Sequence, residues 1–350
     1  MENRLVMGSI RINGITYTAE NVCTFPSEKE WQKDIRDFLK MLFDPSAEQI
    51  AFHTSGTTGP PKTICFTKQQ LIRSARTTCG FFGLTESTTG LLCLPCKYVA
   101  GRLMLVRAMV SGMDLVAVSP SLFPLEEISA QPIHFAAMTP AQVYTCIRKD
   151  LPDFEKIGTV IIGGGEISAG LEEQLRRVDN SLYATYGMTE TLTHVAVREI
   201  GESEYKAVDP ETVFSVTDDQ RLVITIPYIR EEPLETTDIV ELKSSASFHW
   251  LGRADNVINS GGVKLHPEQI EQKLQSADIL SGRVFYVTSR KNETFGELPV
   301  LVVEHIGEPP GHSFLDILNP LLGKHEQLKA VMFVPQIFRT ETGKIIRNKF

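Results

Sequence analysis

Hydrophobic positions along the chain follow two different spacings. In residues 31–42, 71–82 and 171–178 they recur every three or four residues, which is the period of an amphipathic helix. Short β-branched runs at 160–162 and 222–226 are bounded by Gly, Pro or Asp and have the length of strands. The alternation of the two patterns predicts an α/β fold with largely buried strands.

The pattern changes beyond Arg253. A polar, glycine-containing segment there precedes a helix that starts at Pro267. Three apolar runs of strand type follow it, at 284–287, 300–303 and 331–334. We therefore predict a large N-terminal domain with mixed sheets, residues 1–254, and a small α+β C-terminal domain, residues 255–350.

Composition and charge narrow the class of protein. The 350-residue chain is 42% hydrophobic and 22% charged, a balance typical of a soluble globular protein. Its formal net charge of -8 argues against a surface that neutralises nucleic-acid phosphates. No run is apolar over the length of a signal peptide or a membrane span. We expect a cytoplasmic protein with no nucleic-acid partner and no membrane association, and we leave a homodimer open.

The cysteines and histidines suggest no metal or redox site. The six cysteines are scattered through apolar stretches, which predicts buried free thiols rather than a disulfide framework. Cys93 and Cys96 form a C-x-x-C pair, but no second Cys or His pair stands at zinc-ligand spacing. The eight histidines show no ligand pairing on one helix face. We predict no metal site built from His or Cys.

The densest candidate for chemistry is the segment Thr54–Lys62, which reads Thr-Ser-Gly-Thr-Thr-Gly-Pro-Pro-Lys. Its glycines permit close backbone approach, and its hydroxyls, N–H groups and ammonium suit a phosphate chain. Two prolines separate the second glycine from the lysine, so the segment is not a Walker A loop. From these residues alone, a Ser/Thr/Gly surface loop between two strands is an equal alternative.

Two further segments follow expected strands. Tyr186–Glu190 offers an aromatic face for a base, a flexible turn, a hydroxyl and a carboxylate able to hold Mg²⁺ against phosphate oxygens. Gly163–Glu166 places bare backbone between a strand and a helix, where a ligand ring can lie. Taken singly, each segment is also compatible with a tight structural turn.

Two polar positions complete the set. Asp238 stands before an apolar pair and is the type of residue that holds ribose hydroxyls, although exposed Asp is common at strand starts. Lys344 follows Gly343 near the end of the chain. It is either a solvated tail lysine or a mobile point charge for a phosphoryl or carboxylate group.

The order of these segments resembles the acyl-adenylate-forming family of acyl-CoA synthetases, adenylation domains and luciferases. The similarity covers residues 50–350 and includes Tyr-Gly-x-Thr-Glu, Thr-Asp, Gly-Arg-x-Asp-x-x-Ile, Ser-Gly-Gly and the terminal Gly-Lys. It implies an acyl-CoA-synthetase-like fold, shortened before the phosphate loop, with a mobile C-terminal domain. It also implies an acid–thiol ligase that uses ATP and Mg²⁺ to form an acyl-adenylate and then a thioester with CoA.

The resemblance assigns a role to residues of each segment. It implies an ATP phosphate site of Thr54, Ser55, Gly56, Thr57, Thr58, Gly59 and Lys62. It implies an adenine site of Gly164, Gly165 and Tyr186, an ATP-binding role for Gly187, and a ribose site of Asp238 and Arg253. It implies catalytic roles for Thr189 at the acyl-phosphate, Glu190 at Mg²⁺ and Lys344 between the acid carboxylate and ATP. It implies a hinge at Asp255 and a CoA-side loop of Gly261, Gly262 and Lys264.

A separate segment bears on the acid. Leu94–Gly101 resembles the family's Leu-Pro-x-x-His-x-x-Gly, with Tyr98 in place of the histidine, and leads into an apolar helix with Arg102 and Arg107. A small acid with a second carboxylate needs such a cation in an apolar pocket, although either arginine alone is more simply a surface residue.

Together with Thr139, this segment is similar to o-succinylbenzoate–CoA ligases of menaquinone synthesis, so o-succinylbenzoate is the leading substrate hypothesis. The alternatives are another aryl- or acyl-CoA ligase, an adenylating enzyme that loads a carrier protein, and a degenerate nucleotide-binding scaffold without activity.

Overall fold

The computed structural model describes residues 8–53, 63–128, 132–275, 277–307, 313–339 and 345–350. The chain forms two compact units, which are described separately. Unit 1 contains Met1–Gly164, Val178–Val213 and Thr225–Glu232, and unit 2 contains Gly165–Arg177, Phe214–Ile224 and Pro233–Phe350. The predicted domain boundary at residue 254 marks the start of a mobile C-terminal domain. The division into two units does not test this mobility, so the boundary stays a prediction.

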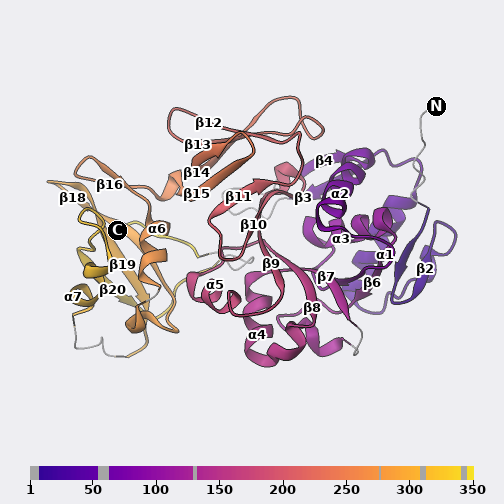
Figure 1. Cartoon of the computed structure of the whole chain (residues 1–350), viewed down its shortest axis with the longest axis horizontal. Helices are drawn as coiled ribbons and strands as arrows, with labels where there is room; N and C mark the ends of the chain where they lie inside the picture. The colour runs from indigo at the N-terminus through magenta and orange to yellow at the C-terminus, as the bar shows by residue number, and fades with distance from the viewer. Residues whose placement is uncertain (1–7, 54–62, 129–131, 276, 308–312, 340–344) are drawn as a thin grey trace. The chain divides into compact units, whose positions relative to one another are not determined.

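Unit 1 is an α/β unit, as the sequence predicts (Figure 1). Its helices are α1 (Glu30–Phe43), α2 (Lys68–Phe82), α3 (Val99–Ser111) and α4 (Pro140–Phe154), with 3-10 turns η1 (Val22–Thr24), η2 (Pro124–Glu127) and η3 (Thr189–Thr191). Its strands are β1 (Ile10–Ile12), β2 (Ile15–Tyr17), β3 (Gln49–His53), β4 (Thr63–Thr67), β5 (Thr89–Leu92), β6 (Asp114–Ala117), β7 (Ile133–Met138), β8 (Ile157–Ile162), β9 (Ser181–Gly187), β10 (His194–Glu199) and β11 (Glu204–Ala207).

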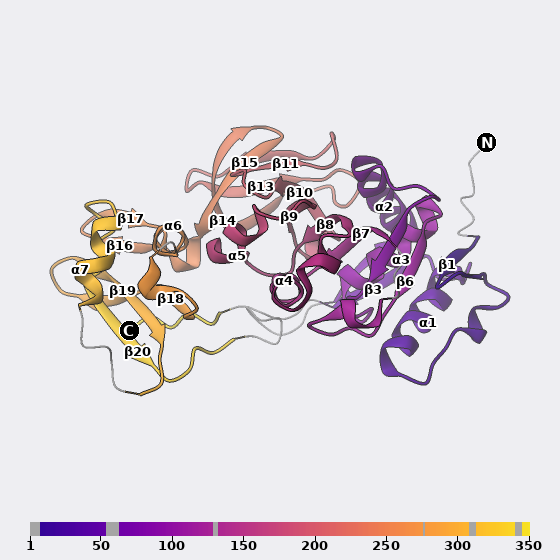
Figure 2. The same cartoon turned by 60° about the horizontal axis from the view of Figure 1, so that its bottom comes forward.

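The main sheet of unit 1 has a parallel centre. Strands β1, β6, β5, β7, β8 and β9 lie in that order and pair in parallel, whereas β2 at one side and β10 and β11 at the other are antiparallel. Strands β7, β8 and β9 run side by side in both views (Figures 1 and 2). Phe135, Val160 and Leu91 are fully buried, which explains the nearly continuous apolar runs of these strands.

The parallel pairing brings four of the predicted segments to one edge. Strands β5, β7, β8 and β9 all end at the same side of the sheet, and their carboxyl ends are followed by Cys93, Thr139, Gly163 and Met188. Backbone and side-chain hydrogen bonds tie these ends together, because Gly163 N donates to Met138 O and Gln142 Nε2 donates to Cys93 O. Ligands of open parallel sheets bind at this edge.

A tight turn joins β9 to β10. Gly187 stands directly opposite His194 in the antiparallel pair. A Cβ at Gly187 would lie 2.3 Å from Thr193 O and 2.5 Å from His194 Cα, so no other residue fits there without movement of the backbone. The absent side chain therefore allows the turn that holds Thr189 and Glu190.

Unit 2 holds a region of four consecutive strands and a small α+β region. Its elements are α5 (Ala169–Leu175), β12 (Val213–Val216), β13 (Arg221–Thr225), β14 (Leu234–Ser244), β15 (Ser247–Arg253), η4 (Ala254–Asn256), β16 (Ile258–Ser260), β17 (Val263–Leu265), α6 (Pro267–Leu274), η5 (Asp278–Leu280), β18 (Phe285–Asn292), β19 (Gly296–Glu304), α7 (Phe314–Leu318), η6 (Asn319–Leu321) and β20 (Ala330–Val334). Helices α6 and α7 share a buried apolar core with β18 and β19. The predicted helix at Pro267 and the three predicted strands after it are confirmed.

A buried ion pair fastens the last described segment to unit 2. Arg347 Nη2 donates to Glu271 Oε2 at 2.8 Å, and Nη1 contacts the other carboxylate oxygen. Nη1 also donates to Val287 O at 3.2 Å, while Val287 N donates to Glu271 at 2.6 Å. Such a two-pronged, hydrogen-bonded pair fixes geometry more than it adds stability, because both charges lose water.

The cysteines differ in part from the sequence-based expectation. All six are free thiols, and Cys79, Cys93, Cys96 and Cys146 are buried, but Cys23 and Cys65 are exposed. Cys65 is exposed because it points outward from β4 in the two-stranded β3–β4 hairpin. Burial raises the pKa of Cys93 to about 12, which makes the thiolate needed for redox or metal chemistry scarce at neutral pH. In the described ranges, no helix is both long and apolar enough to cross a membrane.

The close approach at Gly187 predicts a specific sensitivity to one methyl group. Gly187→Ala should destabilise the protein by about 1–3 kcal/mol, because the added Cβ overlaps backbone that cannot move freely. Gly80→Ala is the matched control, since Gly80 lies on an exposed face of α2 with open space at its Cβ position. This control should stabilise the helix by about 0.5–1 kcal/mol. Chemical denaturation of both variants measures the difference, and equal effects would contradict the close contact.

Candidate active site

The predicted phosphate segment is the connection of the β3–β4 hairpin. His53 and Thr63, the described residues on either side of this segment, pair directly across the two strands. Thr54, Ser55, Gly56, Thr57, Thr58, Gly59 and Lys62 lie outside the described residues. Their role at the ATP phosphates stays a prediction.

The glycine turn after β8 exposes bare backbone at the sheet edge. A Cβ at Gly163 would meet Thr185 Oγ1 at 2.3 Å, and this hydroxyl donates to Ile162 O at 3.1 Å. Gly164 has φ +78°, a left-handed conformation that glycine adopts without strain. The turn thus needs glycine at both positions, and it leaves a surface on which a flat ring can rest.

Tyr186 stands at the end of β9, next to that turn. Its ring is half-buried and makes an edge-on contact with Tyr205, with 6.0 Å between ring centroids. Since β8 and β9 are neighbours in the sheet, the glycine turn and the Tyr186 ring belong to one edge. Gly164, Tyr186 and Gly187 thus belong to unit 1, whereas Gly165 belongs to unit 2, and the proposed nucleotide contacts of these residues stay predictions.

The turn that carries Thr189 and Glu190 is held from within. Thr191 is fully buried, and its Oγ1 accepts from Met188 N at 3.0 Å and donates to Thr193 O at 2.7 Å. Leu192 has φ 64° and ψ -43°, and Thr193 N donates to Thr191 O across it at 2.7 Å. These values describe a γ-turn with positive φ, a rare and strained conformation for a residue other than glycine.

Glu190 is the predicted Mg²⁺ residue, and its surroundings fit a singly held ion. Its side chain is half-buried on η3, beside the half-buried Thr189. In the part of the chain that the structure describes, no group of three or more His, Cys, Asp or Glu side chains could hold a metal. Mg²⁺ at a nucleotide site commonly takes one or two carboxylates, and phosphate oxygens and water complete its shell. One carboxylate therefore suits an ion brought with a nucleotide.

Arg107 is buried, so the simpler interpretation of it as a surface residue is wrong. It is only 2% exposed, and its Nη2 donates to Thr193 Oγ1 at 3.0 Å. Nη1 contacts Met104 Sδ at 3.5 Å, and Nε has no partner among the described residues. Burial lowers the pKa of Arg107 to about 10, so folding disfavours its charged form. A buried guanidinium without a described carboxylate partner is suited to an anionic ligand.

The other predicted acyl-pocket residues have contacts within the fold. Arg102 donates to Cys96 O at 2.8 Å and to Ala51 O at 2.9 Å, and it lies over the Phe38 and Phe52 rings. Thr139 caps α4 by accepting from Gln142 N at 3.2 Å. Tyr98 is half-buried at the start of α3 and packs against Lys97. These contacts explain Arg102 and Thr139 without a ligand, and the acyl-substrate roles of all three residues stay predictions.

The predicted ribose pair lies in unit 2, where β14 and β15 place Asp238 directly opposite Arg253. Asp238 is buried and accepts a 3.1 Å hydrogen bond from Trp250 Nε1. Trp250 was not predicted as a site residue. An indole N–H on a strand nevertheless usually needs a hydrogen-bond acceptor when it is buried. Arg253 also contacts Asp255, the predicted hinge residue, at 3.0 Å on the surface. The structure thus brings the ribose pair and the hinge position together.

The predicted CoA-side loop is a two-residue hairpin turn between β16 and β17. Gly261 and Gly262 have φ 57° and 83°, the pair of positive values that a tight hairpin of this type requires. Lys264 is exposed on β17, opposite Asn259. The turn is therefore determined by its glycines, while its proposed contact with CoA stays a prediction.

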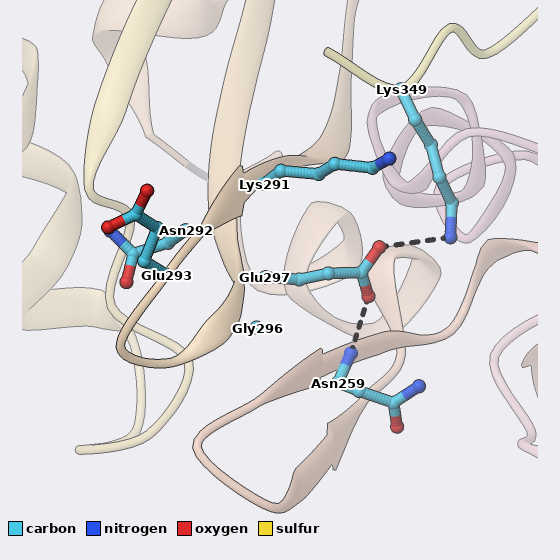
Figure 3. Close-up of a pocket in the computed structure, with 7 residues that line it drawn as sticks. All are labelled: Asn259, Lys291, Asn292, Glu293, Gly296, Glu297 and Lys349. Atoms are coloured by element: carbon cyan, nitrogen blue, oxygen red, sulfur yellow. Dashed lines mark hydrogen bonds and ion pairs between the residues drawn. The ribbon is translucent and has the colours of Figure 1, made fainter.

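A separate hollow lies in unit 2 around Glu297 (Figure 3). Although burial acts to raise it, the pKa of Glu297 is lowered, because Asn259 N, Ser289 and Lys349 all contact the carboxylate. The Lys291 side chain extends beside Lys349 in this view (Figure 3). The central carboxylate is satisfied by the protein, so the hollow gives no indication of a ligand.

Comparisons with known proteins agree with the geometry. A 2-succinylbenzoate–CoA ligase of Listeria innocua is 26% identical over 340 residues, which cover 89% of this chain and 71% of the relative. An AMP-forming acyl-CoA synthetase/AMP-acid ligase II-like protein of Dyadobacter fermentans has 29% identity and a TM-score of 0.63, covering 93% of this chain and 95% of that chain. The o-succinylbenzoate CoA synthetase of Bacillus subtilis, solved with ATP and magnesium, has 20% identity and a TM-score of 0.70, covering 84% and 68%.

These likenesses confirm the predicted acyl-CoA-synthetase-like fold, and the last of them bears on the fold alone. A family model described as AMP-binding enzyme matches residues 15–224, which is more than half of the sequence. The chain therefore belongs to the AMP-binding enzyme family.

Proposed function

We propose that the protein is an AMP-forming acid–thiol ligase that joins a small dicarboxylic acid to CoA. In the first half-reaction the acid carboxylate attacks the α-phosphorus of ATP, the bond to pyrophosphate breaks, and an acyl-adenylate forms. In the second, the CoA thiol attacks the acyl carbon, loses its proton, and expels AMP. The observation that carries this proposal is the meeting of the segments after β5, β7, β8 and β9 at one sheet edge.

The protein's part in the first step is to bring two anions together. A carboxylate and a polyphosphate repel each other, so positioning and neutralisation of charge supply most of the catalysis. Lys344 supplies a positive charge between the two, and the Thr189 hydroxyl contacts the developing acyl-phosphate. Glu190 would hold Mg²⁺, which neutralises phosphate charge when it is bound. The turn at Leu192 fixes Thr189 and Glu190 before substrate arrives.

The second step uses a different face of the C-terminal region. Asp255 is the proposed hinge position, and the loop of Gly261, Gly262 and Lys264 is proposed to meet CoA. Movement about a hinge allows one site to serve two half-reactions in turn. The cytoplasmic location and a homodimer remain predictions.

The choice of a dicarboxylic acid rests on Arg107. Its guanidinium is buried on α3, close to the turn that carries the catalytic side chains. The uncompensated charge would be costly in a protein that bound only monocarboxylic acids. The names of relatives such as the Listeria innocua ligase support 2-succinylbenzoate, an aromatic acid with two carboxylates, as the substrate.

A panel of acids tests the proposed activity. Pyrophosphate release should depend on ATP, Mg²⁺ and the acid, and a thioester should form only when CoA is added. We expect o-succinylbenzoate to exceed the matching mono-acid that lacks the ring carboxylate by about tenfold or more in kcat/KM, as expected for loss of one charge-assisted contact. Good turnover of the mono-acid with none of o-succinylbenzoate would contradict the substrate.

Replacing Arg107 should separate binding from stability. Arg107→Met fills the same space without a charge that folding must bury, so we expect an unchanged or higher Tm. The variant should raise KM for the dicarboxylic acid by about tenfold and leave that of the mono-acid nearly unchanged. Thermal unfolding and initial rates measure the two effects. A strong fall in Tm, with equal losses for both acids, would assign Arg107 to the core alone.

Lys344 should be confined to the first half-reaction. Lys344→Ala removes the cation between the two anions, and we expect adenylation to fall by about 10²-fold or more. Thioester formation from supplied acyl-adenylate should remain within about threefold of the wild-type rate, because the phosphate transfer is already complete. Single-turnover assays measure each step. Equal losses in both steps would show that the assigned role is wrong.

A further inference from the structure

We propose that His194 is a positioning residue for the acid, acting through Thr193 on Arg107. This inference rests on the proposed function, because it concerns the orientation of the Arg107 guanidinium, which would bind the second carboxylate of the acid. The side chains involved are Arg107 on α3, Thr193 and His194 at the start of β10, and Thr78 on α2. All four belong to unit 1.

The four side chains form a continuous row. Arg107 Nη2 lies 3.0 Å from Thr193 Oγ1, which lies 3.4 Å from His194 Nδ1. His194 Nε2 lies 3.3 Å from Thr78 Oγ1, and Thr78 Oγ1 donates to Ser74 O at 3.3 Å. The row therefore ends on a backbone carbonyl of α2, an acceptor that cannot change its role.

The terminal carbonyl sets the direction of every bond in the row. Because Thr78 uses its only hydrogen on Ser74 O, its oxygen can only accept from His194. His194 must then carry its proton on Nε2 and leave Nδ1 as an acceptor for the Thr193 hydroxyl. With its hydrogen directed to His194, the Thr193 oxygen presents lone pairs to Arg107.

The imidazole is also kept neutral, which this direction requires. Burial and the positive charge of Arg107 both lower the pKa of His194 well below its usual value. A protonated ring would donate from both nitrogens, so the Thr193 hydroxyl hydrogen would lose its acceptor at Nδ1. The hydroxyl could then rotate, and its lone pairs would no longer be held toward Arg107.

Arg107 depends on this acceptor because it has few others. Among the described residues, Thr193 supplies the one oxygen that accepts from its side chain, beside the Met104 sulfur. Nε stays without a partner there. Loss of the Thr193 acceptor would leave the cation free to turn, so the second carboxylate would lose its fixed target.

Thr193 and His194 also belong to the turn that carries Thr189 and Glu190. His194 stands opposite Gly187, and Thr193 follows the strained Leu192. The same short segment thus holds Thr189 and Glu190 on one side and the acceptor for Arg107 on the other. A positioning role predicts an effect on dicarboxylic acids alone. A role in packing predicts an equal effect on all acids.

Thr78→Val tests the inference without changing any residue placed at the substrate. Valine keeps the shape and removes the acceptor for His194 Nε2–H, so the ring can change tautomer. We expect KM for o-succinylbenzoate to rise about fivefold, with kcat and the constants for the matching mono-acid changed less than twofold. Thr78→Ser, which keeps the hydroxyl, should restore the wild-type KM.

Thr145→Val is the matched control. Thr145 also donates to the carbonyl four residues earlier, Ala141 O at 2.8 Å, but it is half-buried on α4 and its hydrogen bond is exposed. Its kinetics should equal those of the wild type for both acids. Equal changes for both acids in Thr78→Val, or none, would overturn the positioning role.

The tautomer gives a second test that needs no substrate. In ¹⁵N-histidine spectra of the full chain, the His194 signals, assigned by their loss in His194→Gln, should show Nε2 protonated and Nδ1 bare from pH 6 to 8. A protonated Nδ1 in the wild type would overturn the inference while leaving the proposed function intact. A wild-type enzyme that turns over mono-acids but no dicarboxylic acid would overturn both.

Discussion

The contact of Gly187 with the backbone of Thr193 and His194 is the constraint on which the candidate active site depends. The chain must leave β9, place a hydroxyl and a carboxylate at the sheet edge, and return as β10 within six residues. The turn closes only because Gly187 has no Cβ and because Leu192 accepts a positive φ. The buried Thr191 hydroxyl compensates part of this cost by bonding both arms of the turn.

Three arginines show how the same side chain can serve different purposes. Arg102 donates to two backbone carbonyls, and Arg347 donates to the Glu271 carboxylate. Both guanidinium groups therefore have acceptors within the fold. Arg107 is as buried as a core phenylalanine, yet one hydroxyl oxygen is its described oxygen acceptor. Since burial of a charge is costly unless it is paired, the unpaired case is the one that indicates a ligand.

Much of the fold could be predicted from periodicity. The helical spacing from Trp31 to Leu42 corresponds to α1, and the apolar run at 300–303 lies within β19, because both patterns reflect one buried face or core strand. The hairpin at Gly261-Gly262 also follows from local chemistry. Periodicity alone does not give the order of strands, and it was this order that brought Thr139, Gly163 and Tyr186 to a common edge.

The site could be predicted less completely, because its key contacts are not local. The sequence presents Arg102 and Arg107 as equal candidates, and only their surroundings separate them. Thr193 and His194 gave no signal, since a threonine and a histidine at a strand start are ordinary residues. Their importance comes from Thr78, which is distant in the sequence and reaches His194 only because α2 lies beside the start of β10.

Three departures from ordinary packing lie near this place in unit 1. The strained Leu192, the unpaired Arg107 Nε and the bare glycine turn after β8 all lie at or next to the ends of β8 and β9. Each costs stability, and none is needed to form the parallel sheet. A fold under selection for stability alone would remove them by ordinary substitutions, so their coincidence is best explained by binding and catalysis.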